Sequence, residues 1–209
     1  MDWCYSARIV YSDVRHNFLL HYLLAAAVVF ITPLFFSVSG LDSRQAAQPL
    51  EMIISLTGTV LLTPVFMPEQ NGSIRDVIRS KKTPYLLTCI VRLCIDMLIL
   101  AALAGISVLY MKKCRSEVTF LHFAGTAASA MALGSLGFFA AGLSNNVIIG
   151  YMASLLWYII NFTAKDKLGV FFIFSMMNGS FDEKKWLLAL SFALILLTFV
   201  YLSYVKYKI

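Results

Sequence analysis

The sequence predicts an all-α integral membrane protein with six transmembrane helices. One reason is composition: the 209 residues are 60% hydrophobic and only 13% charged, with a mean hydropathy of +0.79. A soluble domain of this composition would expose a large apolar surface. The other reason is length, because a helix needs about 20 mostly apolar residues to cross a bilayer. The stretches that reach or approach this length are Phe18–Ser39, Pro49–Met67, Tyr85–Met111, Thr119–Leu143, Val147–Thr163 and Trp186–Tyr204. They leave little other chain, so we expect residues 1–209 to form a single transmembrane domain.

The segment before the first span, residues 1–17, has the pattern of an amphipathic helix. Its apolar stripe consists of Trp3, Ala7, Val10 and Val14, which repeat at helical spacing. We therefore expect this helix to lie in the membrane interface, with the indole of Trp3 near the lipid headgroups. A secretory signal peptide is a weaker interpretation, because the following apolar run is long and is interrupted by Pro33.

Residues 68–84 form a polar, basic loop between the second and third spans, and a short helix is predicted within it. Ser73 and Asp76 have the spacing of a capping box. One face of this helix is apolar and consists of Ile74, Val77 and Ile78, whereas Arg75, Arg79 and Lys82 form a basic face. Such a helix could dock on a soluble partner, and the alternative is an ordinary solvated loop.

The segment 164–185 between the fifth and sixth spans departs from a simple loop. Its apolar part, Leu168–Met177, has about half the length that a crossing helix needs. We expect a re-entrant or interfacial hairpin that other parts of the protein shield, since irregular backbone at membrane depth requires such shielding.

The third span contains two charged residues, Arg92 and Asp96. At i, i+4 they lie on one face of a helix and could form an intramembrane ion pair, which is a candidate functional feature. Alternatively, Arg92 extends to the membrane interface and Asp96 only satisfies it.

The fourth span is rich in small residues with small-xxx-small spacing. The pairs are Gly125/Ser129, Ala128/Ala132 and Gly137/Ala141. This spacing lets helices approach closely in lipid. The sequence leaves open whether the stripe packs within the chain or at a dimer seam.

Several chemistries are excluded by the motifs. The chain has no G-x-x-x-x-G-K-[ST] phosphate loop, no H-E-x-x-H, no G-x-S-x-G and no C-x-x-C, and its three histidines lack metal-ligand spacing. We therefore expect no catalytic residues, no metal site and no bound cofactor. The net charge of +6 is divided among membrane loops, which favours contact with anionic lipid headgroups over nucleic acid.

The order of these features resembles the permease subunits of type-2 ATP-binding-cassette (ABC) transporters. Permeases of that family have an interfacial helix before span one, a glycine-rich span four and a re-entrant hairpin after span five. They also carry a motif between spans two and three, matched here by Glu69, Gly72, Ser73, the segment 74–79, Pro84 and Arg92. The resemblance covers nearly the whole chain in layout, but its residue motif is confined to about 69–92. The basic loop after span three, Lys112-Lys113-Cys114-Arg115, departs from the family pattern, and the chain is short for such subunits.

The resemblance implies a non-catalytic permease subunit of an ABC exporter that moves an amphipathic peptide, lipid-like or drug-like cargo. ATP and Mg²⁺ would bind to a separate ATPase subunit. That subunit would receive a coupling helix formed by residues Ile74–Arg79, and a second permease, identical or homologous, would complete the pump. The residues implied in coupling are Glu69, Gly72, Ser73, Ile74, Arg75, Val77, Ile78 and Arg79.

The orientation expected is a multi-pass protein of the cell membrane with both termini in the cytoplasm. Charge does not decide this, because each side of the membrane receives the same number of basic residues, eight. The alternative function, in a different class, is a stand-alone membrane immunity or sensor protein without an ATPase partner.

Overall fold

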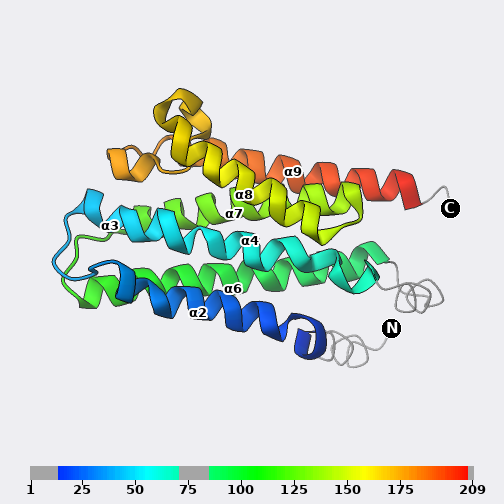
Figure 1. Ribbon diagram of the computed structural model, residues 1–209, viewed down its shortest axis with the longest axis horizontal. Helices are drawn as coiled ribbons and strands as arrows, with labels where there is room; N and C mark the ends of the chain where they lie inside the picture. Colours follow the sequence, from blue (N-terminus) through cyan, green and yellow to red (C-terminus); the bar gives the residue numbers. More distant parts are fainter. Residues whose placement is uncertain (1–13, 71–84, 207–209) are drawn as a thin grey trace.

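The computed structural model describes residues 14–70 and 85–206, and every regular element in these ranges is helical (Figure 1). The first span consists of η1 (Val14–Phe18) and α2 (Leu19–Phe35). The second span is composite and runs through α3 (Ser43–Pro49), η2 (Leu50–Ile54), α4 (Leu56–Leu62) and η3 (Thr63–Gln70). The remaining elements are α6 (Tyr85–Lys113), α7 (Phe120–Ser144), α8 (Val147–Ala164), η4 (Lys165–Phe171), η5 (Ser175–Asn178) and α9 (Glu183–Lys206).

Six stretches of the described chain are helical, long and apolar enough to cross a membrane: His16–Phe35, Ser43–Pro68, Leu86–Lys113, Phe120–Ser144, Val147–Ala164 and Glu183–Tyr204. Each of them overlaps one predicted span, which confirms the prediction of an all-helical, multi-pass membrane protein. The second span begins at Ser43, before the predicted start at Pro49. The reason is that Pro49 lies within the helical run, at the boundary where α3 passes into the wider π-helical turn of η2.

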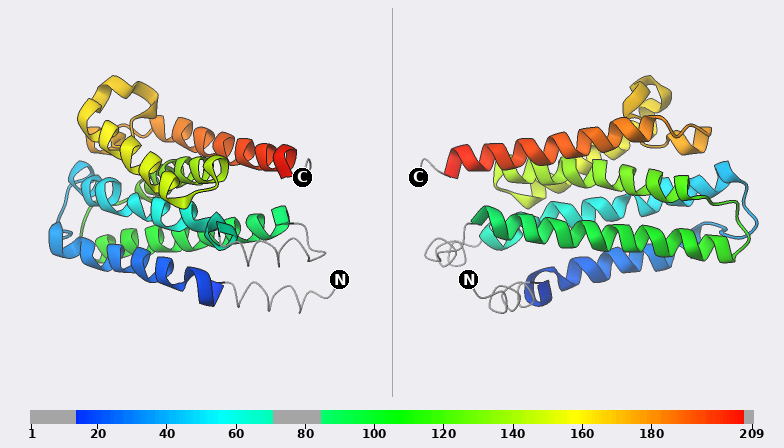
Figure 2. Two further views of the ribbon diagram at one scale, coloured as in Figure 1. Left: turned by 45° about the vertical axis from the view of Figure 1, so that its right-hand side comes forward. Right: turned by 180° about the vertical axis from the view of Figure 1, so that it is seen from behind.

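The second and fourth spans form the buried centre of the bundle. Within their most apolar stretches, 72% and 61% of residues are buried, against 22% to 28% for the other four spans. In Figures 1 and 2, α7 lies against α4 on one side and α8 and α9 on the other. The helices α2 and α6 are peripheral and expose apolar side chains, as expected for surfaces that face lipid.

Glycines in α4, α7 and α8 allow the backbones at this centre to touch. A Cβ atom on Gly58 would lie 1.8 Å from the carbonyl oxygen of Ala130, and one on Gly134 would lie 2.4 Å from the carbonyl oxygen of Gly58. On the other side of α7, a Cβ on Gly150 would lie 2.6 Å from the carbonyl oxygen of Gly137. The small residues of span four therefore pack within the chain, which answers the question that the sequence leaves open for this stripe.

The two ends of the bundle carry different connections between helices. The start of α2, the end of η3, the start of α6 and the end of α9 lie at one end, together with the α7–α8 turn (Figure 1). At this turn, Asn145 adopts a left-handed conformation (φ 52°) and its carbonyl oxygen accepts a hydrogen bond from Gln70, 3.3 Å. The connections α2–α3, α6–α7 and α8–α9 lie at the opposite end (Figure 2).

The α8–α9 connection folds back against the bundle. It contains η4 and η5, separated by Phe172, Ile173 and Phe174, which leave helical geometry. These side chains pack with Leu133 of α7 and Leu187 of α9 in one buried cluster. The connection thus contributes to the core, and adds no seventh long helix to the described chain.

The glycine contacts give a prediction with an internal control. Gly58→Ala forces a methyl group into the Ala130 carbonyl and should lower the free energy of unfolding by at least the roughly 1–3 kcal/mol typical of overpacking. Gly105→Ala should be neutral or stabilising by up to about 1 kcal/mol, because the new methyl group meets only the Phe123 ring at 3.7 Å. Unfolding in bicelles by denaturing detergent measures both. Equal effects of the two substitutions would contradict direct backbone contact between α4 and α7.

Candidate functional site

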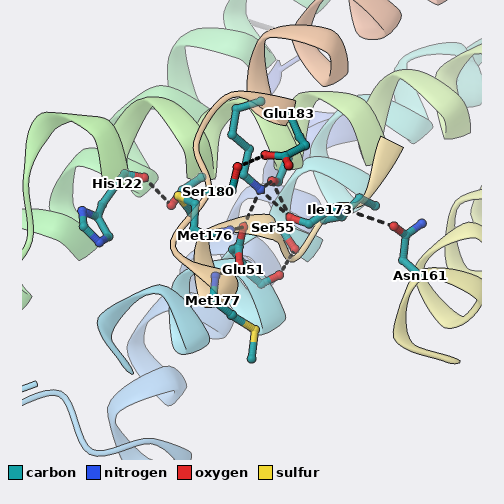
Figure 3. A network of polar contacts seen from close by, with 12 residues as sticks. Glu51, Ser55, His122, Asn161, Ile173, Met176, Met177, Ser180 and Glu183 are labelled. Atoms are coloured by element: carbon teal, nitrogen blue, oxygen red, sulfur yellow. Dashed lines mark hydrogen bonds and ion pairs between the residues drawn. The ribbon is translucent and has the colours of Figure 1, made fainter. Parts of the chain in front are cut away.

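The most polar buried site of the described chain is built around Glu51, in the first part of span two. Its side chain is fully buried. One carboxylate oxygen, Oε1, accepts the backbone N–H of Met176 at 3.0 Å, and Oε2 accepts that of Met177 at 3.1 Å. Figure 3 shows Met176 and Met177 of η5 next to this carboxylate. A single side chain of span two therefore satisfies two backbone donors of the α8–α9 connection.

The counter-ion of Glu51 is Lys184, the second residue of α9. Its ammonium group is buried, forms an ion pair with the Glu51 carboxylate, and donates hydrogen bonds to the Ile173 carbonyl oxygen and, at 2.7 Å, to Ser129 Oγ of α7. All three ammonium protons thus have acceptors. A cation at a helix N-terminus interacts unfavourably with the helix dipole, and a buried cation loses its hydration. The Glu51 carboxylate offsets both costs for Lys184.

Asn161, near the end of α8, holds the same connection from the other side. Its Oδ1 accepts the backbone N–H of Ile173 at 2.9 Å, while its Nδ2 donates to the Trp157 carbonyl oxygen at 2.9 Å (Figure 3). Both backbone polar groups of Ile173 are therefore bound by side chains, one from Asn161 and one from Lys184.

His122, at the start of α7, links three elements next to this site. Its Nδ1 accepts the backbone N–H of Thr119 at 3.2 Å, which leaves Nε2 as the donor to the Ser43 carbonyl oxygen at 3.0 Å. The Phe181 ring meets the imidazole edge to face, with 5.3 Å between centroids. The imidazole thus joins the N-termini of α3 and α7 to the α8–α9 connection.

The contact between Ser129 and Lys184 resembles the nucleophile and base of a Ser–Lys dyad, but the environment favours a structural role. A lysine acts as a base only as a neutral amine, whereas this ammonium group has a carboxylate partner. Ser129 and Glu51 are also fully buried, so a substrate has no access to either. We therefore interpret Glu51, Lys184, Ser129 and Asn161 as a latch that fixes the α8–α9 connection to spans two, four and five.

The sequence patterns did not predict this latch. They placed Lys184 within the expected re-entrant segment 164–185 and gave no role to Glu51. A signal was present, since Glu51 is the one acidic residue between Asp42 and Glu69 and lies at the start of a long apolar run. The partner is 133 positions away in sequence, and no helical periodicity connects residues at that separation.

Arg92 and Asp96 are buried in α6. The Tyr22 hydroxyl donates to Asp96 Oδ1 at 2.9 Å, whereas Arg92 Nη1 donates to the Val65 carbonyl oxygen at 3.2 Å, with its guanidinium 5.5 Å from the Phe18 ring centroid. Asp96 therefore joins α6 to span one, and Arg92 joins α6 to span two and to the Phe18 ring of span one. Their mutual ion pair stays a prediction, and the coupling energy in an Arg92→Gln, Asp96→Asn double-mutant cycle would measure it.

Most of the predicted coupling residues lie outside the described part of the chain: Gly72, Ser73, Ile74, Arg75, Val77, Ile78 and Arg79. The predicted interfacial helix also lies outside it up to residue 13. Glu69 lies in η3. In the part of the chain that the structure describes, no group of three His, Cys, Asp or Glu side chains could hold a metal ion.

Comparisons of the chain with protein-family models, with curated proteins and with solved structures return no match. The resemblance to type-2 ABC permeases therefore depends on the layout of the spans and on the motif at 69–92.

The latch predicts non-additive effects on stability. Lys184→Met leaves the Glu51 carboxylate without its counter-ion, and Glu51→Gln leaves a buried ammonium. Each should destabilise the fold by roughly 3–5 kcal/mol, the usual cost of breaking a buried pair. The double variant should recover part of this loss, because the glutamine that replaces Glu51 is neutral and its side-chain oxygen still accepts a backbone N–H. A thermodynamic cycle of unfolding in bicelles measures the coupling.

The matched control for this cycle is Lys185→Met, on the adjacent position of α9. Lys185 pairs with Asp182, but its side chain is 81% exposed, so its loss should change stability little. Additive effects of the Glu51 and Lys184 substitutions, or an equal effect of Lys185→Met, would rule out the latch.

Proposed function

We propose that this chain is the membrane-spanning, non-catalytic permease subunit of an ABC exporter. The observation that supports this most is the arrangement of the chain at one end of the bundle. The end of η3 and the start of α6, which flank the predicted coupling segment, lie at the same end of the bundle as the start of α2 and the end of α9 (Figure 1). A soluble ATPase could therefore meet the loop after span two and both terminal segments on one side of the membrane.

The composite second span offers a route for coupling. It leads directly into the predicted coupling segment at one end and carries Glu51 at the other, and it is the most buried span of the described chain. Close-packed elements move as units. A displacement of η3 would therefore move α7 through the Gly58–Ala130 contact, and α9 through the Glu51–Lys184 ion pair. Movement started by ATP binding would thus reach the far end of the bundle.

The remaining parts of the proposal follow from the resemblance. Two permease subunits, identical or homologous, would pair in the cell membrane with N- and C-termini in the cytoplasm. The cargo would pass between them, and the exposed apolar faces suit an amphipathic peptide, a lipid-like molecule or a drug-like molecule. ATP and Mg²⁺ would act on the partner subunit.

The α8–α9 connection is part of the same proposal as a re-entrant segment. Its residues Phe172–Phe174 lie in the core cluster with Leu133 and Leu187, and its backbone is satisfied by Glu51, Asn161 and Lys184, as membrane depth requires. In a background without native cysteines, Lys167→Cys and Lys185→Cys should react with an impermeant thiol reagent from the same side. Labelling from opposite sides would exclude a re-entrant path.

The decisive test of the proposed function addresses the predicted apolar face of the coupling helix. Val77→Asp would place an unpaired charge in an apolar groove of the ATPase, which is costly on docking. The tagged chain, purified from native membranes, should carry a stoichiometric soluble ATPase, and the Val77→Asp variant should lose it. Lys82→Gln changes the net charge by the same amount in the same segment but lies on the predicted basic face, and should retain the ATPase.

Failure to recover an ATPase with the unmodified chain would favour the stand-alone immunity or sensor protein. Equal recovery of the ATPase with Val77→Asp and Lys82→Gln would favour the interpretation of residues 68–84 as an ordinary solvated loop. In both variants, unchanged elution and thermal melting of the membrane domain show that the fold is retained.

A further inference from the structure

A cavity lies between spans one, two and three, at the end of the bundle away from the termini. Its volume is about 350 Å³, near the lower end of the roughly 300–1,000 Å³ range of ligand pockets. Its walls include Val29 and Pro33 of α2, Ile54 of η2, and Ser107, Tyr110 and Met111 of α6.

The lining of this cavity suits hydrocarbon. The hydroxyl groups of Thr32 and Ser107 are turned to their own helices, where they donate to the carbonyl oxygens of Val28 and Leu103, each at 2.8 Å. They therefore offer no free donor to a polar ligand. Phe30 and Leu34, which also line the cavity, are 74% and 82% exposed. The cavity thus continues into the outer surface of a transmembrane helix, where acyl chains are the surrounding medium.

Basic side chains lie next to this cavity. Lys113 follows the lining residues Ile106 and Tyr110 by seven and three positions, which places the three on the same side of α6. Lys112, Lys113 and Arg115 are all exposed. Over residues 112–119, three basic side chains (Lys112, Lys113, Arg115) accompany one acidic side chain (Glu117), a net charge of 3 − 1 = +2.

The backbone that carries these cations is fixed against the loop after span one. The N–H of Gly40 donates to the Cys114 carbonyl oxygen at 3.1 Å, and the N–H of Glu117 donates to that of Leu41 at 2.9 Å. Ser116 Oγ donates to the carbonyl oxygen of Val38, itself a lining residue, at 2.7 Å. These hydrogen bonds therefore fix the position of the basic turn relative to the cavity.

We propose that this cavity binds one acyl chain of an anionic phospholipid, with the phosphate of that lipid against Lys113 and Arg115. The apolar walls accept the chain, and the basic turn at the end of α6 selects the charge of the headgroup. This site is independent of the proposed transport function, because it needs neither an ATPase nor a second permease. It also gives a role to the basic loop after span three, which departs from the permease pattern.

The test uses the purified full chain in nanodiscs with equal parts of phosphatidylglycerol and phosphatidylcholine. After release into mild detergent, native mass spectrometry counts the lipids that stay bound. The unmodified chain should retain phosphatidylglycerol in preference to phosphatidylcholine. Lys113→Gln should lower that preference about fivefold, the ratio that corresponds to about 1 kcal/mol for one cation at an anionic surface. Lys112→Gln, on the other side of α6, should have a smaller effect.

A second pair of variants addresses the chain-binding part. Val29 is buried at the cavity wall, so Val29→Phe should fill the cavity and reduce retention of both lipids. Leu24→Phe, at a lipid-facing position of α2 outside the cavity, should not. Equal retention of the two lipids by the unmodified chain would overturn the proposal, as would an unchanged preference in Lys113→Gln. The Lys113 variant keeps the test valid if Val29→Phe fails to fold, because Lys113 is exposed.

Discussion

A carboxylate that is fully buried in a helical membrane bundle needs a positive partner and hydrogen-bond donors, and the rest of the structure is arranged to supply them. Glu51 receives an ammonium group from Lys184 and two backbone N–H groups from η5. The α8–α9 connection in turn needs these side chains. The α8–α9 connection leaves helical geometry at Phe172–Phe174, and backbone without helical hydrogen bonds is costly away from water. Asn161 and Lys184 bind the backbone of Ile173 in this stretch, and Glu51 binds the N–H groups of Met176 and Met177 just after it, so the polar side chains and the irregular segment depend on each other.

The latch also divides the molecule into a tightly packed part and a peripheral part. Glycine contacts press α4 and α8 against α7, and the latch adds α9 and the α8–α9 connection to this unit. The helices α2 and α6 join it mainly through apolar packing, and Arg92 of α6 also binds the Val65 carbonyl oxygen of span two. The hydrogen bond between Tyr22 and Asp96 joins α2 to α6. Any large movement within the chain should therefore occur between the α7-centred unit and α2 or α6, where the acyl-chain cavity is also found.

The sequence was sufficient for the spans but not for the latch, and the reason is physical. Membrane spans follow from hydrophobic runs that are local in sequence, so Tyr85–Met111 and Val147–Thr163 agree closely with α6 and α8. The stripe from Gly125 to Ala141 predicted close helix contact, but not its partner, because small residues pack equally well within a chain or between chains. Glu51 and Lys184 could not be paired from sequence, since their contact depends on how α9 and span two meet. The coupling motif at 69–79 remains a prediction, as its residues beyond Gln70 lie outside the described chain.

Glu51 and Lys184 hold the α8–α9 connection in the core, and hydrogen exchange measures this most directly. In nanodiscs, the backbone amides of Ile173, Met176 and Met177 should exchange as slowly as those in the middle of α7, because each is bound by a buried side chain. Lys184→Met should speed exchange at these three amides and leave the middle of α8 unchanged. Rapid exchange of the three amides in the unmodified protein would contradict the latch.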